Sequence, residues 1–276
     1  MSEFKPKSPG QSPISRAFQV GSWAFVTGGS DGLGLALAEE AAMRGLNCLL
    51  VARRADVLAA AAVKLRRHDV EIRTLSLDLE AGDAVERLEQ ATRDLPLTLA
   101  VFNAGAEASG DEFIEGEWDQ WNSAIQRNVV FLTRALHYFS RRLVQTGGGG
   151  ILVVGSEAAF GGVARSGVYA ASKGFALNLC EALWAELGPK GVDVTTLLFA
   201  IADTPTLRRT LERKGIPVDV VNPASPADLA RAAMDGLGTG PVVNFDETDP
   251  HDSLTSAAKR RARVEAKSEL VRTFYG

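Results

Sequence analysis

A tyrosine and a lysine one helical turn apart are the residues of this chain best suited to acid–base chemistry. Tyr169 and Lys173 have the spacing Y-x-x-x-K, which places both side chains on one face of a helix. An ammonium beside a phenol stabilises the phenolate and lowers the phenol pKa from about 10 toward neutrality. The pair can therefore exchange a proton with a substrate, although the spacing alone also fits a partly exposed surface pair.

A glycine-rich turn near the N-terminus is suited to bind a phosphate. Residues 27–34 read T-G-G-S-D-G-L-G, after an apolar run at 23–26 and before an alanine-rich helical pattern at 35–43. Glycines let backbone N–H groups approach a pyrophosphate at the positive end of the following helix. The same residues also fit a tight turn without a ligand. The expected ligand contacts are Gly28, Ser30, Asp31, Gly32, Leu33 and Gly34.

Two further predicted strands end in polar residues. The run Asn103-Ala104-Gly105 follows the apolar residues 97–102, and Ser156 follows the apolar residues 151–155. In an open α/β sheet a ligand lies at the carboxyl ends of the strands. Asn and Ser are also common turn formers, so neither residue alone indicates a ligand site.

A polar residue interrupts the apolar stripe of a long helix predicted over Trp118–Val144. Asn128 falls on this stripe. A buried amide requires hydrogen-bond partners, so Asn128 is either a structural residue bonded to a neighbouring carbonyl or part of a site. The residue pattern leaves both interpretations open.

Alternating strand and helix patterns predict an α/β fold. We expect a Rossmann-type doubly wound parallel sheet with helices on both faces. With 276 residues and 46% hydrophobic content, one large domain over residues 21–250 is favoured. It follows a flexible N-terminal arm over 1–20 and precedes a helical tail over 251–276. The predicted strands are 23–26, 46–51, 70–77, 97–102, 151–155, 192–198 and 241–244.

Composition and charge argue against several other classes. The 30 basic and 34 acidic residues give a net charge of −4, which does not support nucleic-acid binding. No apolar run reaches the roughly 18 residues of a membrane span. Cys48 and Cys180 stand alone, so neither a metal site nor a redox motif is indicated. A soluble cytoplasmic protein without a metal is expected.

Together these motifs resemble the short-chain dehydrogenase/reductase family in its single-domain form, over about residues 23–244. The resemblance rests on T-G-x-x-x-G-x-G, N-A-G, Ser156, Y-x-x-x-K and Asn128. It implies that Tyr169 is the general acid for carbonyl reduction and the base for alcohol oxidation. It implies that Ser156 bonds the substrate oxygen and that Lys173 holds the nicotinamide ribose. Asn128, in a helix irregularity, would hold a water that links Lys173 to solvent.

The turn after the second predicted strand favours NADP(H) over NAD(H). Arg53 and Arg54 stand there without an acid, and guanidinium groups can bind the 2′-phosphate that distinguishes NADP(H). They can equally begin a solvated helix. Asp31 opposes the prediction, because relatives that prefer NADP(H) often carry a basic residue at that place. Asp31 can repel the phosphate or orient an arginine.

The resemblance implies cofactor contacts from two further turns. Asp78 and Leu79 would frame the adenine, although Asp78 also fits a helix cap. Ile201 and Thr204 are candidates to bind the carboxamide. The chain has Phe199-Ala200 where relatives usually have Pro-Gly, which changes the shape of the nicotinamide-binding loop.

The sequence thus predicts an NADP(H)-dependent carbonyl reductase that interconverts a ketone and a secondary alcohol on a hydrophobic substrate. Residues 206–221 offer apolar side chains for a lid. One alternative is a 3-oxoacyl-thioester reductase; another is a non-catalytic NADP(H)-binding sensor or scaffold, which the altered Phe199-Ala200 loop favours. The resemblance also implies a homodimer or homotetramer through the helices 118–144 and 169–187, with Trp184 exposed.

Overall fold

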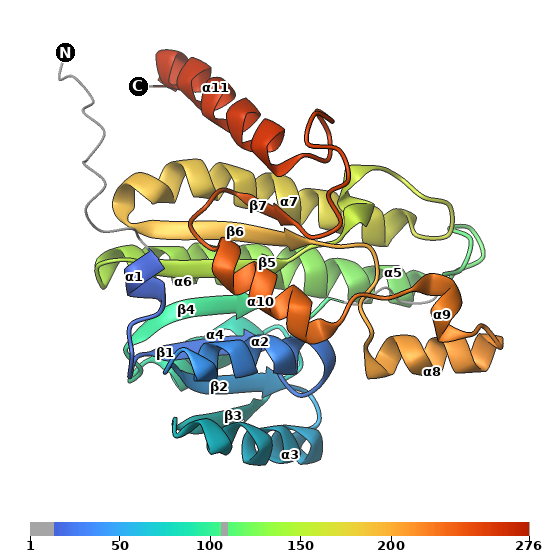
Figure 1. Cartoon of the computed structure of the whole chain (residues 1–276), viewed down its shortest axis with the longest axis horizontal. Helices are drawn as coiled ribbons and strands as arrows, with labels where there is room; N and C mark the ends of the chain where they lie inside the picture. Colours follow the sequence, from blue (N-terminus) through green and yellow to red (C-terminus); the bar gives the residue numbers. More distant parts are fainter. Residues whose placement is uncertain (1–13, 106–109, 276) are drawn as a thin grey trace.

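The computed structural model describes residues 14–105 and 110–275, and its centre is one parallel sheet of seven strands (Figure 1). The strand order is β3-β2-β1-β4-β5-β6-β7. This confirms the predicted doubly wound α/β class. The strands are β1 Trp23–Thr27, β2 Asn47–Ala52, β3 Ile72–Ser76, β4 Leu97–Phe102, β5 Gly149–Val154, β6 Val192–Leu198 and β7 Val242–Asn244.

Helices cover both faces of the sheet, because its central strands are apolar on both sides. One core lies between the sheet and α2 (Gly32–Met43), α3 (Ala55–Leu65) and α10 (Pro226–Gly236). The second core lies beneath α4 (Ala84–Thr92), α6 (Leu132–Gln145) and α7 (Gly167–Leu187). Phe25, Phe102 and Phe139 pack together in the second core.

The helix predicted over Trp118–Val144 is continuous but not uniform. It begins as α5 (Trp118–Ile125), widens into the π-helical η2 (Gln126–Phe131) and continues as α6. The irregularity contains Asn128, where the resemblance placed one. Such π segments occur frequently at functional sites.

The remaining helices connect or extend the two layers. The helix α8 (Pro205–Lys214) and the short α9 (Val218–Val221) form the predicted lid segment, which projects from the carboxyl edge of the sheet (Figure 1). The others are α1 Ile14–Ala17, η1 Arg66–His68, η3 Glu157–Phe160, η4 Gly188–Lys190 and α11 Ala257–Tyr275.

Both ends of the described chain contact the sheet domain. Residues 1–13 of the expected arm lie outside the described residues, whereas Ala17 of α1 is fully buried and accepts a hydrogen bond from Thr98. The helix α11 packs on α7, and its Arg261 lies over the ring of Trp184 at 5.7 Å. Trp184 is half-buried, so the prediction that it is exposed is wrong.

The sheet places the predicted motifs at one edge. The chain runs from β1 outward to β3 and then returns to the other side of β1 to form β4. This reversal opens a crevice at the carboxyl ends of β1 and β4, where α/β proteins bind ligands. In the described residues, none of the helices is long and apolar enough to cross a membrane.

Candidate active site

The glycine turn after β1 forms a cradle of bare backbone. Gly28 and Gly32 have φ values of +68° and +53°, which favour glycine. A Cβ at Gly28 would lie 2.7 Å from Nδ2 of Asn103, and one at Gly34 would overlap the carbonyl oxygen of Gly28. The turn leads directly into α2. Its backbone N–H groups therefore lie at the positive N-terminal end of that helix. A pyrophosphate binds at such a position.

Asn103 fastens the end of β4 to this turn. Its side-chain amide donates to the carbonyl oxygen of Thr27 at 3.1 Å, and its backbone N–H donates to Oγ1 of Thr27 at 3.0 Å. Thr27 Oγ1 also accepts from the Ala104 N–H at 3.2 Å. The Thr27 side chain thus joins two motifs that are 76 residues apart in sequence.

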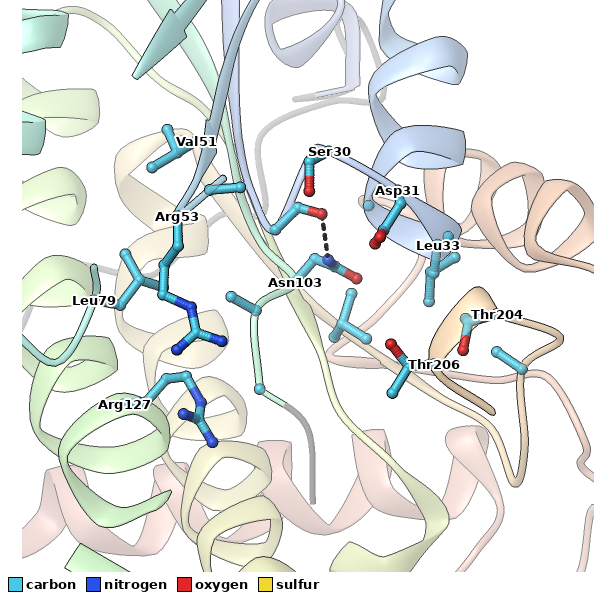
Figure 2. A pocket seen from close by; sticks show the side chains of 18 of the residues that line it. Ser30, Asp31, Leu33, Val51, Arg53, Leu79, Asn103, Arg127, Thr204 and Thr206 are labelled. Atoms are coloured by element: carbon cyan, nitrogen blue, oxygen red, sulfur yellow. Dashed lines mark hydrogen bonds between the residues drawn. The ribbon is translucent and has the colours of Figure 1, made fainter. Parts of the chain in front are cut away.

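A cleft of about 720 Å³ lies along these turns (Figure 2). This volume is in the range of small-molecule and cofactor sites. The bare glycine backbone and the helix N-terminus fit the diphosphate of a nicotinamide dinucleotide. Every residue predicted to bind the cofactor lines this cleft: Gly28, Ser30, Asp31, Gly32, Leu33, Gly34, Arg53, Arg54, Asp78, Leu79, Asn103, Ala104, Gly105, Tyr169, Lys173, Ile201 and Thr204.

Tyr169 and Lys173 enter the cleft from α7. The Nζ of Lys173 lies 5.6 Å from the centre of the Tyr169 ring and donates to the carbonyl oxygen of Val154 at 2.8 Å. Burial lowers the pKa of Lys173 to about 8, and the charge of Arg127 acts in the same direction. The Tyr169 phenol therefore lies near a buried amine, that of Lys173, whose pKa is lowered toward neutral pH.

Asn128 lies behind these two residues. Its Nδ2 donates to Oγ of Ser172 at 3.1 Å, and Ser172 in turn donates to the carbonyl oxygen of Tyr169 at 2.7 Å. Within the described part of the chain, Oδ1 of Asn128 has no hydrogen-bond partner. A Cβ added to Gly105 would lie 3.0 Å from this oxygen and 3.4 Å from Nζ of Lys173. Asn128 thus supports α7 and keeps one acceptor near the lysine.

Ser156 lies two residues after the end of β5 and caps the turn η3. Its side chain is buried, and Oγ accepts a hydrogen bond from the Ala158 N–H at 3.2 Å. Because a hydroxyl both accepts and donates, its hydrogen is available for a substrate oxygen. Ser156 is outside the residues that line the cleft, but the preceding Gly155 lines it and η3 packs against α7.

The cationic end of the cleft lies after β2. Arg54 donates from Nη2 to Oδ2 of Asp31 at 2.7 Å. Asp31 thus forms an ion pair with one of the two arginines predicted to bind a 2′-phosphate. Arg53 extends into the cleft with its guanidinium on the same side as that of Arg127 (Figure 2).

The loop after β6, which begins with Phe199-Ala200, is held by hydrogen bonds to neighbouring segments. The Ala200 N–H donates to Oδ2 of Asp246 at 2.7 Å, and Ile201 accepts from the Ala224 N–H at 2.9 Å. Thr204 Oγ1 caps α8 by accepting from the Leu207 N–H at 3.2 Å. These bonds keep the loop along the cleft. Asp78 likewise makes a local bond, to the Glu80 N–H at 3.1 Å, but α4 begins only at residue 84.

Sequence reasoning missed several residues of the cleft. Arg127 precedes Asn128 in η2, and its Nη1 donates to Oε1 of Glu80 at 2.5 Å. No motif marks this pair, because 47 residues separate its members. The other residues that were missed are Val51, Ala52, Leu77, Val154, Gly155 and Ala202.

Arg127 provides a test of the electrostatics around Lys173. Replacing Arg127 with Gln removes a positive charge, so the pKa of Lys173 rises from about 8 and the ammonium persists to higher pH. We expect the alkaline limb of the kcat/KM profile to move to higher pH. Glu80→Gln removes the negative charge beside Arg127 and should move this limb in the opposite direction. Identical profiles for the three proteins would show that Lys173 does not control the limb.

The fold and the residues of the cleft define a dinucleotide-dependent oxidoreductase site. Residues 22–224 match the family model of short chain dehydrogenases. The chain belongs to the short-chain dehydrogenase/reductase family, and it is an oxidoreductase that acts on CH–OH or C=O groups.

The chain is similar in sequence, over most of its length, to three relatives of different activity or source. The chain is 28% identical to the 7beta-hydroxysteroid dehydrogenase of Clostridium sardiniense, over 80% of this chain and 84% of the relative. It is 28% identical to the very-long-chain 3-oxoacyl-CoA reductase of Meyerozyma guilliermondii, over 84% and 70%. A solved short-chain dehydrogenase from Sphingobium yanoikuyae in complex with NADPH is 29% identical, with a TM-score of 0.77 over 91% of this chain and 95% of that one.

Proposed function

We propose that this protein is an NADP(H)-dependent reductase that interconverts a ketone and a secondary alcohol on a hydrophobic substrate. The observation that carries the proposal is the position of Tyr169 and Lys173. Both side chains line one cleft with the glycine cradle, so a proton donor lies beside the site of a dinucleotide.

In the proposed reaction Tyr169 donates its phenolic proton to the carbonyl oxygen, and Ser156 stabilises that oxygen by a hydrogen bond. The bound nicotinamide supplies the hydride for the carbonyl carbon. The Lys173 ammonium stabilises the phenolate that Tyr169 becomes. Asn128 is proposed to link Lys173 to solvent, so that Tyr169 is reprotonated. In alcohol oxidation Tyr169 accepts the proton instead.

The proposed substrate is an apolar ketone or alcohol. Leu207 of α8 lines the cleft, while Ile216 and Val218 are each 37% exposed at the end of the lid segment. The lid segment thus offers apolar surface, which reaches the cleft at Leu207. The activities of the relatives on a hydroxysteroid and on very-long-chain acyl groups agree with a substrate of this kind.

The preference for NADP(H) rests on Arg53 and Arg54. Replacing Arg53 with Ala is expected to raise the Kd of NADPH by about 10- to 100-fold, because a charge-assisted bond contributes about 1.5–3 kcal/mol. The Kd of NADH should remain unchanged, since it lacks the 2′-phosphate. Arg66→Ala, an exposed arginine of η1 outside the cleft, is the control. Equal weakening of both cofactors by Arg53→Ala would contradict the assignment.

The decisive assay follows the absorbance of NADPH with purified protein and a panel of steroid ketones, other bulky ketones and 3-oxoacyl thioesters. Turnover of one substrate class that requires Tyr169 supports the proposal. Faster turnover of carrier-bound thioesters than of free ketones favours the 3-oxoacyl-thioester reductase, for which Arg208 and Arg209 lie exposed on α8. Tight NADPH binding without any turnover favours the sensor or scaffold.

We further propose a homodimer or homotetramer and a cytoplasmic location. The helices that the family uses for assembly expose Trp118, Val130 and Phe175, which are 65%, 38% and 40% exposed. Large exposed apolar side chains on neighbouring elements are typical of an interface.

A further inference from the structure

A buried arginine connects the C-terminal helix to the turn that carries Ser156. Arg260 of α11 is only 3% exposed. Its Nε donates to Oε1 of Glu181 at 2.6 Å, and its Nη1 donates to the carbonyl oxygen of Leu254 at 2.8 Å. Its guanidinium also lies over the ring of Phe160, 5.6 Å from the ring centre. Phe160 is the last residue of η3, which begins directly after Ser156.

The partner of Arg260 belongs to the catalytic helix. Tyr169, Lys173, Leu177 and Glu181 follow one another at intervals of four residues on α7, so each lies about one turn further along the helix than the one before it. Leu177 forms a small apolar cluster with Leu198 and Val242, and Phe160 packs against this cluster together with Ala257 of α11. The beginning of α11 and the end of the Ser156 turn therefore share one packing site.

Stability alone is a weak reason to keep this ion pair. Glu181 is 4% exposed, and it also accepts a hydrogen bond from Arg263 at 3.2 Å. Burying charges is costly, and well-packed apolar residues often stabilise a protein at least as well as a buried pair. A planar guanidinium has a property that apolar residues lack, because it can bind a carboxylate, a carbonyl and an aromatic face at fixed directions.

We propose that Arg260 is a positioning residue that holds the Ser156 turn against α7, so that α11 is part of the support of the active site. The helix lies outside residues 22–224, which match the family model. It contacts α7 and then extends away from it toward the C-terminus (Figure 1). The inference rests on the function proposed above. Because Ser156 caps η3 and Phe160 ends it, we expect a shift of the Phe160 ring to change the direction of the Ser156 hydroxyl.

The test compares Arg260→Lys with Arg261→Lys. Arg261 anchors the same helix, with its Nη1 donating to Thr239 at 3.0 Å, but it contacts Trp184 rather than the Ser156 turn. Arg260→Lys keeps a positive charge near Glu181 but loses the planar guanidinium that contacts Leu254 and Phe160. We therefore expect kcat to fall by about 10- to 100-fold through misplacement of Ser156. The Kd of NADPH should not change, and Arg261→Lys should leave both values unaltered.

Two further measurements separate positioning from a general loss of stability. In a Ser156→Ala background, Arg260→Lys should lower kcat little further, because both changes act through the same hydroxyl. Phe160→Leu removes the aromatic face without touching the ion pair and should reproduce the loss. An equal effect of Arg260→Lys with and without Ser156 would overturn the proposal, as would equal effects of Arg260→Lys and Arg261→Lys.

Hydrogen exchange of the amides of residues 157–161 gives a readout that does not depend on activity. Exchange should become faster in Arg260→Lys and stay unchanged in Arg261→Lys. Amide exchange reports how often the turn opens, and only the first substitution removes a contact that holds the turn closed. Unchanged exchange in Arg260→Lys would contradict the structural link. If the protein reduces no ketone but the exchange differs as expected, the proposed function fails and the link between α11 and the Ser156 turn stands.

Discussion

Replacing Tyr169 with Phe is expected to lower kcat for ketone reduction by about 100- to 10,000-fold, which is the usual contribution of a general acid or base. The substitution removes one oxygen and leaves the ring and the helix in place. The Kd of NADPH should therefore change little, because the glycine cradle, Arg53 and Arg54 are untouched. Steady-state kinetics and quenching of protein fluorescence by NADPH measure the two effects separately.

Tyr138 provides the matched control. It lies on α6, where its ring packs edge-on against Phe139 at 4.9 Å, and it is outside the cleft. Tyr138→Phe removes the same hydroxyl from the same kind of residue and should leave kcat unchanged. If Tyr169→Phe retained wild-type turnover, another group would have to donate the proton, and the assignment of Tyr169 would be abandoned.

The second large effect is expected at the glycine cradle. Gly34→Ala places a methyl group against the carbonyl oxygen of Gly28 and Nδ2 of Asn103, so the turn or the first turn of α2 must move. Since forcing an extra methyl group into a packed site typically costs about 1–3 kcal/mol, the midpoint of thermal unfolding should fall. The Kd of NADPH should rise at least tenfold, because the N–H groups of the turn are displaced.

Gly82→Ala is the control for this prediction. A Cβ at Gly82 meets nothing within 4 Å, and its φ lies outside the range that only glycine favours. The variant should bind NADPH and unfold like the wild type. Normal NADPH binding by Gly34→Ala would show that the turn is not the phosphate site, even if the protein were less stable.

Local patterns in the sequence were sufficient to predict the sheet and most of the cleft. Parallel strands end at one edge of a sheet, so the positions of Gly28, Asn103 and Ser156 after apolar runs already placed them together. The pair Tyr169 and Lys173 is separated by a single helical turn, and its spacing depends only on helix geometry. The π-helical segment at Asn128 came from the resemblance, because no propensity of its residues marks a π-helix.

Several contacts that the sequence left undecided join segments that are distant along the chain. The sequence allowed Asp31 either to repel a phosphate or to orient an arginine, and the tertiary structure adds an ion pair between Asp31 and Arg54. It likewise placed Arg127 beside Glu80 and Arg260 between Glu181 and Phe160. Charged residues on helices usually face solvent, so their sequence pattern carries no sign of burial.

By itself, then, the sequence determined the order of strands and helices, the glycine turn and the tyrosine–lysine pair, since each depends on neighbouring residues and on the regular geometry of helices and sheets. Only the tertiary structure decided how the loop at Phe199 is held, through Asp246, and how the C-terminal helix reaches the Ser156 turn. Side chains from separate elements make these contacts, and their distances exist only after the layers have packed.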